Sequence, residues 1–261
     1  MSQKRPPLVE LTEIVARLRG PDGCPWDKDQ TLTSMRPYLL EEVYELLEAM
    51  EHDAGEDGLE GELGDTLFVL LLIAQIGADA GRLTLDSVAQ RIIRKMVVRH
   101  PHVFGDTKDE ENPGGIAAWE ARKQTEGRSR LAGVPRSLPA LLRAHRQGEK
   151  AAAVGFDWTE VGAVLDKVSE EMAELKAAIA SKDSHAIEHE LGDVLMSLAS
   201  LGRHLNTPPE AALRRANDRF ADRFATLERL AQEEGVVLSG SSDADILDEL
   251  WERAKQAEVT C

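Results

Sequence analysis

The sequence EEVYE at residues 41–45, followed by ELGD at 62–65, occurs twice in this chain of 261 residues. It returns as EEMAE at 170–174 and ELGD at 190–193, which lie 129 and 128 residues further on. Two more features repeat in the same order, a basic pair spaced by four residues and a tryptophan followed four residues later by a lysine. This shared order indicates a duplicated module, and two copies are too few for a solenoid. The repeated pairs are Lys95/Arg99 with Arg219/Arg223, and Trp119/Lys123 with Trp251/Lys255.

Helix is the predicted secondary structure throughout. Alanine, leucine, glutamate and arginine are abundant, aromatic residues make up only 4% of the chain, and no convincing strand pattern is found. The fold class that we predict is all-α, with two tandem copies of a four-helix-type module at residues 1–125 and 151–261 and a basic linker at 126–150. Apolar periodicity places the helices at 8–19, 37–50, 59–78, 85–99, 161–179, 185–205, 209–233 and 243–258.

Composition narrows the classes of function. A net charge of −16 argues against general nucleic-acid binding, because a phosphate backbone repels an acidic surface. The longest apolar run, residues 67–74, is too short to span a bilayer, and nothing at the start of the chain resembles a signal peptide. The two cysteines, Cys24 and Cys261, do not make a disulfide framework. We therefore expect a cytoplasmic protein that binds neither membranes nor, stably, nucleic acid.

The repeated carboxylates are candidates for metal ligands. Acidic residues on a helix usually form a solvated face, but the spacing places Glu42 on the same face as Leu39 and Leu46. Glu171 lies in the same kind of apolar stripe in the second copy. A charged carboxylate that enters a core costs several kcal/mol unless it is paired or bound to a metal. The same arrangement in both copies therefore points to compensation by a cation.

The second acidic pair of each copy leads into an apolar helix. Residues 67–74 are apolar on all sides, which predicts burial on most sides and places Asp65 under Val69 and Leu72. Oxygen ligands without thiol or imidazole select Mg²⁺, with Mn²⁺ as a substitute. A di-iron bundle would need Glu-x-x-His, which the sequence lacks, and His189 is interpreted as a surface residue. The expected ligands are Glu42, Glu45, Glu62 and Asp65 in the first copy and Glu171, Glu174, Glu190 and Asp193 in the second.

Basic and aromatic pairs follow the carboxylates in both copies. Each basic pair spans one helical turn, so both cations face one side and could bind a triphosphate, although such a pair alone is more often a solvated face. A nucleobase could stack on the tryptophans, although tryptophan on an amphipathic helix is more often part of a core. The candidate substrate contacts are Lys95, Arg99, Trp119 and Lys123 in the first copy and Arg219, Arg223, Trp251 and Lys255 in the second.

These motifs resemble those of the MazG family, in the all-α superfamily of nucleoside triphosphate pyrophosphohydrolases. The likeness runs from about residue 8 to 258 and includes GPDGCPWD at 20–27 and RHPHVF at 99–104. It implies a homodimeric, Mg²⁺-dependent enzyme that converts nucleoside triphosphates to monophosphates and pyrophosphate and so cleans the nucleotide pool. It also adds Lys167 to the substrate contacts. Family members often carry a lysine before the second acidic pair, where this chain has the segment 185–188, HAIE.

The second copy is expected to carry the main active site. Lys167 precedes Glu171 by one turn where the first copy has Tyr38, and Ser197 and Ser200 stand where the first copy has apolar residues. Phosphoryl transfer depends on positioning and on neutralisation of charge, which this polar pocket suits. The expected catalytic residues are Glu171 and Glu174, and the choice of general base stays open between Glu174 and Glu45.

Three other interpretations stay open. A narrower activity, such as that of a dUTPase-like enzyme or a phosphoribosyl-ATP pyrophosphatase, is disfavoured by the duplication. A metal-stabilised helical scaffold that regulates a partner without catalysis would need no phosphate contacts. A helical interaction module with solvated acidic faces conflicts with the inward direction predicted for Glu42 and Glu171.

Overall fold

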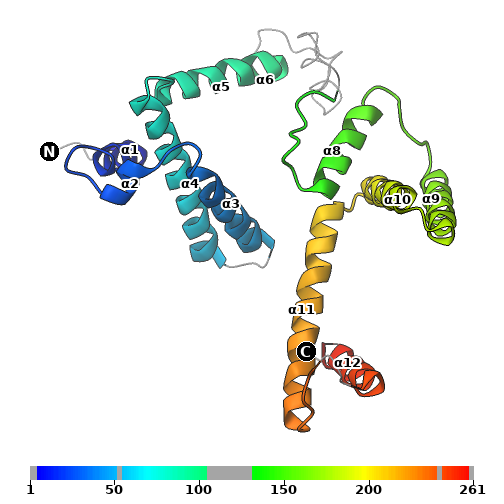
Figure 1. Ribbon diagram of the computed structural model, residues 1–261. Helices are drawn as coiled ribbons and strands as arrows, with labels where there is room; N and C mark the ends of the chain where they lie inside the picture. The colour runs from blue at the N-terminus through cyan, green and yellow to red at the C-terminus, as the bar shows by residue number, and fades with distance from the viewer. Residues whose placement is uncertain (1–4, 52–54, 105–130, 240–242, 259–261) are drawn as a thin grey trace. The chain divides into compact units, whose positions relative to one another are not determined.

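The computed structural model describes residues 5–51, 55–104, 131–239 and 243–258, and every regular element in these ranges is a helix (Figure 1). The chain forms two compact units, Met1–Gly114 and Gly115–Cys261. The predicted all-α class is therefore confirmed. The helix bounds differ from the predicted ones by a few residues at most, and Pro37 lies in the first turn of its helix, where its missing N–H is tolerated.

The first unit is built around one helical hairpin. The hairpin helices, α3 and α4, pack against each other, and α1 packs against α4. Their core contains Val15, Met35 and Leu72, which are almost completely buried. The helices are α1 (Pro7–Leu18), α2 (Pro25–Asp29), α3 (Met35–Glu51), α4 (Gly55–Asp79), α5 (Leu85–Arg99) and α6 (Pro101–Phe104).

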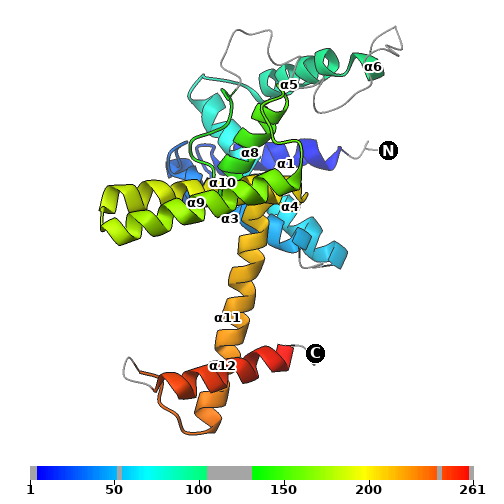
Figure 2. The ribbon, with the colours of Figure 1, turned by 90° about the vertical axis from the view of Figure 1, so that its right-hand side faces the viewer.

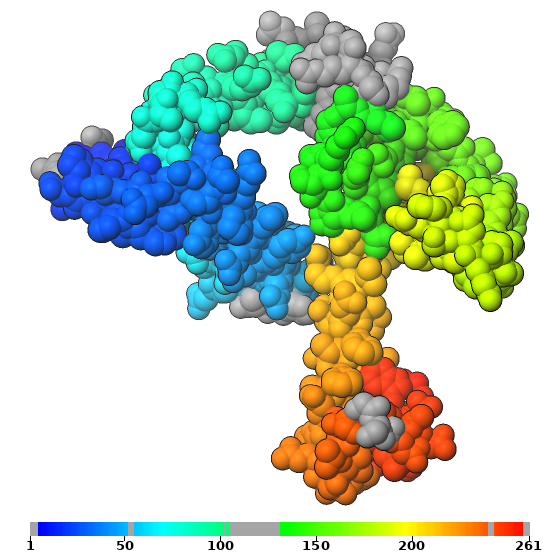
Figure 3. Space-filling view, viewed as in Figure 1, coloured from blue at the N-terminus to red at the C-terminus, as the bar shows by residue number. Residues whose placement is uncertain are grey.

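The second unit repeats the hairpin and adds a long arm. The hairpin helices are α9 and α10, and α8 packs against α10 as α1 does against α4. The arm helix α11 starts beside α8 and α10, and α12 packs near its far end, away from α9 and α10 (Figures 2 and 3). The helices are α8 (Ala140–Ala152), α9 (Val161–Ser181), α10 (Ser184–His204), α11 (Pro209–Glu233) and α12 (Ala244–Glu258).

The turn between α9 and α10 brings the acidic pairs level with each other. Lys182 adopts a left-handed conformation, with φ of 58°, and the Asp183 side chain accepts hydrogen bonds from the first N–H groups of α10. Because the two helices are antiparallel neighbours, residues equally far from the turn lie side by side. Glu174 and Glu190 are each eight residues from Lys182, and Glu171 and Asp193 are each eleven residues from it. The spacing of the motif thus produces the cluster.

Helix α8 overlaps the end of the range predicted as a linker, 126–150. Residues 140–150 belong to a helix that packs against α10 and begins directly after Pro139. The neighbouring prolines and glycines suggested a solvated linker with short helices, whereas this helix packs within the second unit. The remainder of that range up to residue 130, and the predicted end of the first module at 125, lie outside the described residues.

Residues 67–74 are covered on most sides, as predicted, but one row of the helix is exposed. Val69 and Leu72 are buried, but Leu67 and Leu70 are 36% and 48% exposed, because neighbouring helices cover only part of α4. By length and composition alone α4 would also qualify as a membrane-crossing helix, a test that the core helices of soluble proteins pass as well. The exposed row recurs in the second unit, where Leu195 and Leu198 take the equivalent positions on α10.

Candidate functional site

The second carboxylate set converges at the middle of the α9–α10 hairpin. One oxygen each from Glu171, Glu174 and Glu190 lie within 4.8 Å of one another. The side chain of Glu171 is only 7% exposed, and its Oε2 atom, like Oε2 of Glu190, is buried without a hydrogen-bond partner in the described structure. Partial burial, followed by the charges of Glu171 and Glu190, raises the pKa of Glu174. Buried carboxylate oxygens without donors are the environment that a hard divalent cation satisfies.

Asp193 joins this set through His189. The Nδ1 atom of His189 lies 3.1 Å from Asp193 Oδ2 and 3.3 Å from Glu190 Oε1. The interpretation of His189 as a surface residue was incomplete, because its ring is largely exposed but its nitrogen contacts two of the four predicted ligands. The spacing of four residues between His189 and Asp193 was the signal in the sequence that could have revealed this contact.

The first unit holds a cluster of the same kind, with carboxylates that are less buried. Oxygens of Glu42, Glu62 and Asp65 lie within 4.8 Å of one another, and Glu45 is exposed beside them. Burial, and after it the neighbouring carboxylates, raises the pKa of both Glu42 and Glu45. Asp65 is exposed, although Val69 and Leu72, which follow it on the same face of α4, are buried, and its carboxylate lies close to those of Glu42 and Glu62. Glu42 is half-buried, as its apolar neighbours predicted.

Lys167 supplies the cation that the second cluster has and the first lacks. Its Nζ atom lies 2.6 Å from Glu171 Oε1 and 2.8 Å from Glu170 Oε1. Hydrogen bonds to these two carboxylates, Glu170 first, raise the pKa of Lys167 further above its ordinary value, so it stays charged. Tyr38 stands at the equivalent place in the first unit and provides no such charge.

A cavity of about 480 Å³ opens beside Lys167 and Glu171. This volume falls within the range of about 300–1,000 Å³ that is typical of small-molecule sites. Lys167, Glu171 and Asp193 line the cavity, and Ser197 and Ser200 are buried in its lining, although most of the exposed lining is apolar rather than polar. Residues that the sequence analysis did not select complete the wall, namely Leu131, Gln147, Gly148, Ala151, Phe156, Asp157, Trp158, Met196 and Arg203.

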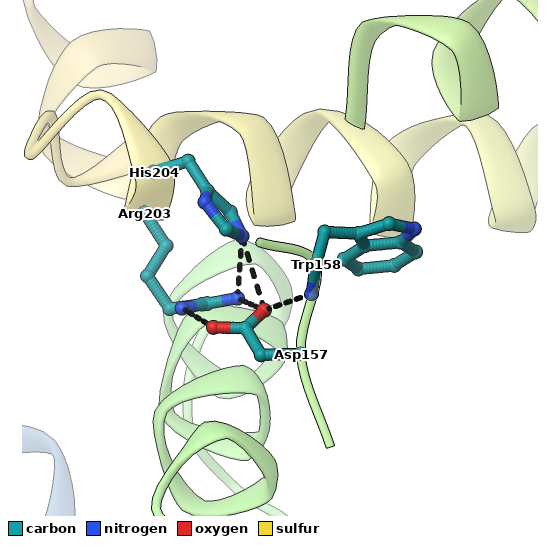
Figure 4. A network of polar contacts seen from close by, with 4 residues as sticks. All are labelled: Asp157, Trp158, Arg203 and His204. Carbon is teal, nitrogen blue, oxygen red and sulfur yellow. Dashed lines mark hydrogen bonds and ion pairs between the residues drawn. The ribbon is translucent and has the colours of Figure 1, made fainter. Parts of the chain in front are cut away.

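A network of polar contacts ties one wall of the cavity to α10 (Figure 4). The Nη1 and Nη2 groups of Arg203 donate to the two carboxylate oxygens of Asp157, with Nη1 at 2.8 Å from Oδ2. His204 Nε2 lies 3.0 Å from Asp157 Oδ1, and the backbone N–H of Trp158 donates to the same oxygen at 2.9 Å. The Arg203 hydrogen bonds lower the pKa of Asp157. Because 46 residues separate Arg203 from Asp157, no local pattern in the sequence could have revealed the pair.

The other predicted substrate contacts do not gather at this cluster in the described structure. Lys167 and His189 are the basic partners recorded for the second set, whereas Arg219 is exposed on α11. The ring centroid of Trp251 lies 5.4 Å from that of Phe220, and Lys255 pairs with Glu252 on its own helix. The remaining candidates are Arg223 on α11 and Lys95 and Arg99 on α5, while Trp119 and Lys123 lie outside the described residues.

Comparison with known proteins places this arrangement in a family. The family model of the MazG nucleotide pyrophosphohydrolase domain matches residues 30–104 and 160–223, which contain both carboxylate sets. The chain belongs to the MazG family. Each MazG match covers one helical hairpin with its acidic pairs, whereas α8 and the 156–158 wall of the cavity lie before the second match.

Several relatives are similar over most of this MazG chain. The nucleoside triphosphate pyrophosphohydrolase of Escherichia coli strain K12 is 42% identical over 257 residues, which cover 95% of this chain and 97% of the relative. The nucleoside triphosphate pyrophosphohydrolase/pyrophosphatase MazG of Thermotoga maritima is 42% identical over 256 residues and 96% of both chains. The uncharacterized protein YabN of Bacillus subtilis is 46% identical over 250 residues, 94% of this chain but only 51% of its own length.

Replacing Asp157 with asparagine should lower stability in a pH-dependent way. The pKa of Asp157 is lower in the folded chain than its ordinary value of 3.8. Ionised Asp157 therefore stabilises the fold at pH values above the pKa that this residue has in the unfolded chain. The stabilisation is lost as the pH falls through its lower pKa in the folded chain. For a side chain that is 23% exposed we expect about 1–3 kcal/mol at neutral pH.

The free energy of unfolding, measured in urea at several pH values, tests this expectation. The difference between wild type and Asp157→Asn should shrink as the pH falls below about 4. A difference that does not change with pH would contradict the ion pair as its cause. Glu233→Gln, which removes an exposed ion pair with Arg229, is the control and should change stability by less than about 1 kcal/mol.

Proposed function

We propose that this chain hydrolyses nucleoside triphosphates to nucleoside monophosphates and pyrophosphate, and that the second carboxylate set holds the Mg²⁺ that the reaction uses. The observation that carries the proposal is the convergence of three carboxylates with two unpartnered buried oxygens, beside Lys167 and an open cavity. Two relatives that match nearly the whole chain carry the name nucleoside triphosphate pyrophosphohydrolase. Clearing unwanted nucleotides from the cytoplasmic pool is the role that we propose for the activity.

The donor set fits a divalent cation that prefers oxygen. Glu171, Glu174, Glu190 and Asp193 would hold it, because oxygens of the first three lie within 4.8 Å of one another, Asp193 approaches Glu190 as closely, and the buried Oε2 atoms of Glu171 and Glu190 lack donors. When bound, Mg²⁺ would neutralise triphosphate charge and lower the pKa of a water molecule. Mn²⁺ would substitute, since it accepts the same ligands.

The chain's own residues divide the remaining tasks. Lys167 presents a permanent positive charge at the mouth of the cavity, where it can bind a phosphate oxygen once substrate competes with Glu170. Glu174 is exposed at the edge of the cluster, so it can reach a water molecule and accept its proton as general base. Buried Glu171 is held by Lys167 and is suited to fixed coordination rather than to proton transfer. Arg219, Arg223, Trp251 and Lys255 stay predicted substrate contacts.

The second unit is the proposed active half. In the first unit, Tyr38 replaces Lys167, and Val69 and Leu72 are buried in the core where Ser197 and Ser200 line the cavity. A highly charged substrate needs charged and polar partners such as Lys167 and the serines of the second unit. We propose that the first set, Glu42, Glu45, Glu62 and Asp65, binds a cation more weakly and contributes little to turnover.

An assay of pyrophosphate release from nucleoside triphosphates tests both the proposed activity and the assignment of the active site to the second unit. Glu171→Gln removes a ligand charge worth several kcal/mol of transition-state stabilisation, so we expect a loss of about 100-fold or more in kcat. The matched variant Glu42→Gln, at the equivalent position of the first unit, should keep at least about half of the activity. Full activity in Glu171→Gln would exclude the second set as the site. An inactive wild type would favour the metal-stabilised scaffold instead.

Thermal unfolding with and without Mg²⁺ tests the cation site separately from catalysis. Binding to the folded chain alone should stabilise the protein by about 2.7 kcal/mol at a concentration 100 times the Kd. The double variant Glu171→Gln/Glu174→Gln should lose most of that gain, because it lacks two of the ligand charges. Glu228→Gln, which changes an exposed carboxylate on α11, should retain the gain. An unaltered Mg²⁺ effect in the double variant would place the cation elsewhere.

An uncovered apolar face supports the proposal of a homodimer. The residues of α9 that face α10 are followed, one position later, by exposed apolar residues, and α10 shows the same pattern. In an antiparallel hairpin these two rows lie on the same side. The equivalent face recurs in the first unit. The rows are Leu165, Met172 and Ile179 with Leu191, Leu195 and Leu198, and Val43 and Met50 with Leu63, Leu67 and Leu70.

Light scattering coupled to size exclusion should report a dimer, because faces of this kind are normally buried between chains. The double variant Leu195→Glu/Leu67→Glu places charges on both faces and should shift the mass to that of a monomer. Val237→Glu, at a similarly exposed apolar residue outside both faces, should leave the dimer intact. A monomeric wild type would contradict the proposal.

A further inference from the structure

The cavity beside Glu171 has an apolar wall that phosphate binding and metal binding do not explain. The side chains of Phe156, Trp158 and Met196 are 81%, 40% and 42% exposed, and all three line the cavity. Two exposed aromatic side chains lie within three residues of sequence, beside a carboxylate cluster. They form a hydrophobic surface whose exposure to water is unfavourable. A ligand with a flat apolar face would cover them.

Polar atoms occupy defined places in the same cavity. The hydroxyl of Ser197 donates to the Val194 carbonyl at 2.8 Å, so the oxygen of this buried residue can still accept a hydrogen bond. The Nε atom of Arg203 is buried without a recorded partner although both Nη groups bind Asp157. Gln147 and Ser200 add an amide and a second hydroxyl to the lining. Such a cavity suits a planar group that carries both donors and acceptors on its edge.

We infer that this cavity is the nucleobase subsite, with the base against Phe156 and Trp158 and the phosphates toward Lys167, Glu171 and Asp193. The inference rests on the proposed function. Its support is the arrangement of charge along α10, because Asp193 lies in the middle of this helix, whereas Asp157, which stands between the two aromatic residues, contacts Arg203 and His204 at the C-terminal end of α10. A nucleotide is divided in the same way, with a base that can stack at one end and an anionic phosphate chain at the other.

The inference assigns base stacking to Phe156 and Trp158 instead of Trp251, the stacking candidate of the sequence analysis. The ring of Trp251 packs against Phe220 and against the small core between α11 and α12, which is the packing role expected of tryptophan on an amphipathic helix. The sequence analysis did not select Phe156 and Trp158, although Gly155-x-x-Trp158 repeats Gly23-x-x-Trp26, which was the signal that could have revealed Trp158.

Asp157 acts as the positioning residue of the subsite. It lies between Phe156 and Trp158 in sequence, and its carboxylate is bound by the guanidinium of Arg203 and by the backbone N–H of Trp158. These contacts fix the aromatic segment to α10, which also carries Glu190 and Asp193. Gly148 of α8 allows this packing, because a Cβ atom there would lie 3.0 Å from Arg203 Nε.

Steady-state kinetics with a panel of nucleoside triphosphates, combined with inhibition by inorganic tripolyphosphate, tests the subsite. Phe156→Ala removes an exposed ring, so the fold is retained, and the KM should rise about 5- to 100-fold while kcat changes little. The inhibition constant of tripolyphosphate, which has no base, should stay the same. Val237→Ala, which shortens an equally exposed apolar residue outside the cavity, should leave both constants unchanged.

Variants of Asp157 test the positioning role in the same assay. Asp157→Ala should raise the KM for nucleotides without changing the inhibition constant of tripolyphosphate, and Asp157→Glu, which keeps the charge for Arg203, should restore part of the loss. An equal rise of both constants in Phe156→Ala or Asp157→Ala would overturn the inference, because the effect would then lie in the phosphate site or in the fold. An unchanged KM in Phe156→Ala would overturn it as well.

Binding of a nucleoside monophosphate, followed by tryptophan fluorescence, separates this inference from the proposed function. If wild type hydrolyses nothing but binds the monophosphate, and Phe156→Ala weakens that binding at least about fivefold, the subsite stands and the hydrolase proposal fails. If wild type hydrolyses triphosphates and Phe156→Ala binds the monophosphate as tightly as wild type, the subsite fails and the hydrolase proposal stands.

Discussion

Repulsion among carboxylates is the constraint on which this structure depends. The packing of α3 on α4, and of α9 on α10, brings two acidic pairs together in each hairpin, so that like charges lie close to one another. Burial is the largest cause of the raised pKa values of Glu42, Glu45 and Glu174, and repulsion by the neighbouring carboxylates raises them further. The hairpins nevertheless close, because apolar residues such as Leu72 and Val164 are fully buried around the clusters. Folding thus builds a site whose charge the proposed cation would offset.

The two units show how one frame takes on different chemistry. The hairpin, its acidic pairs and its exposed apolar rows are repeated, whereas the residues one turn away from the carboxylates differ. Lys167 and the two serines line a cavity in the second unit, whereas Tyr38, Val69 and Leu72 occupy the equivalent positions in the first. Residues outside the matched MazG segments, on α8 and at 156–158, then add an apolar wall. Substrate selectivity can therefore change without any change in the ligand set.

Much of this could be read from the sequence, and the failures have physical causes. Helix bounds and the convergence of the carboxylates follow from local periodicity and from equal spacing about a turn, both of which are encoded in neighbouring residues. The Asp157–Arg203 pair joins residues 46 positions apart, and α8 was hidden among prolines and glycines, so tertiary packing alone reveals the wall of the cavity. The exposure of Leu67 and Leu70 was not predicted, because an apolar pattern on all sides of a helix does not show which row its neighbours leave uncovered.

The most direct test of the central claim is a crystal structure of the full chain grown with Mn²⁺, with anomalous scattering used to locate the ion. The account predicts strong anomalous density among Glu171, Glu174, Glu190 and Asp193, with carboxylate oxygens close enough to coordinate the ion directly. Weaker density is expected at Glu42, Glu62 and Asp65. Density confined to the first unit, or absent from both clusters at saturating Mn²⁺, would contradict the assignment of the second hairpin as the metal site.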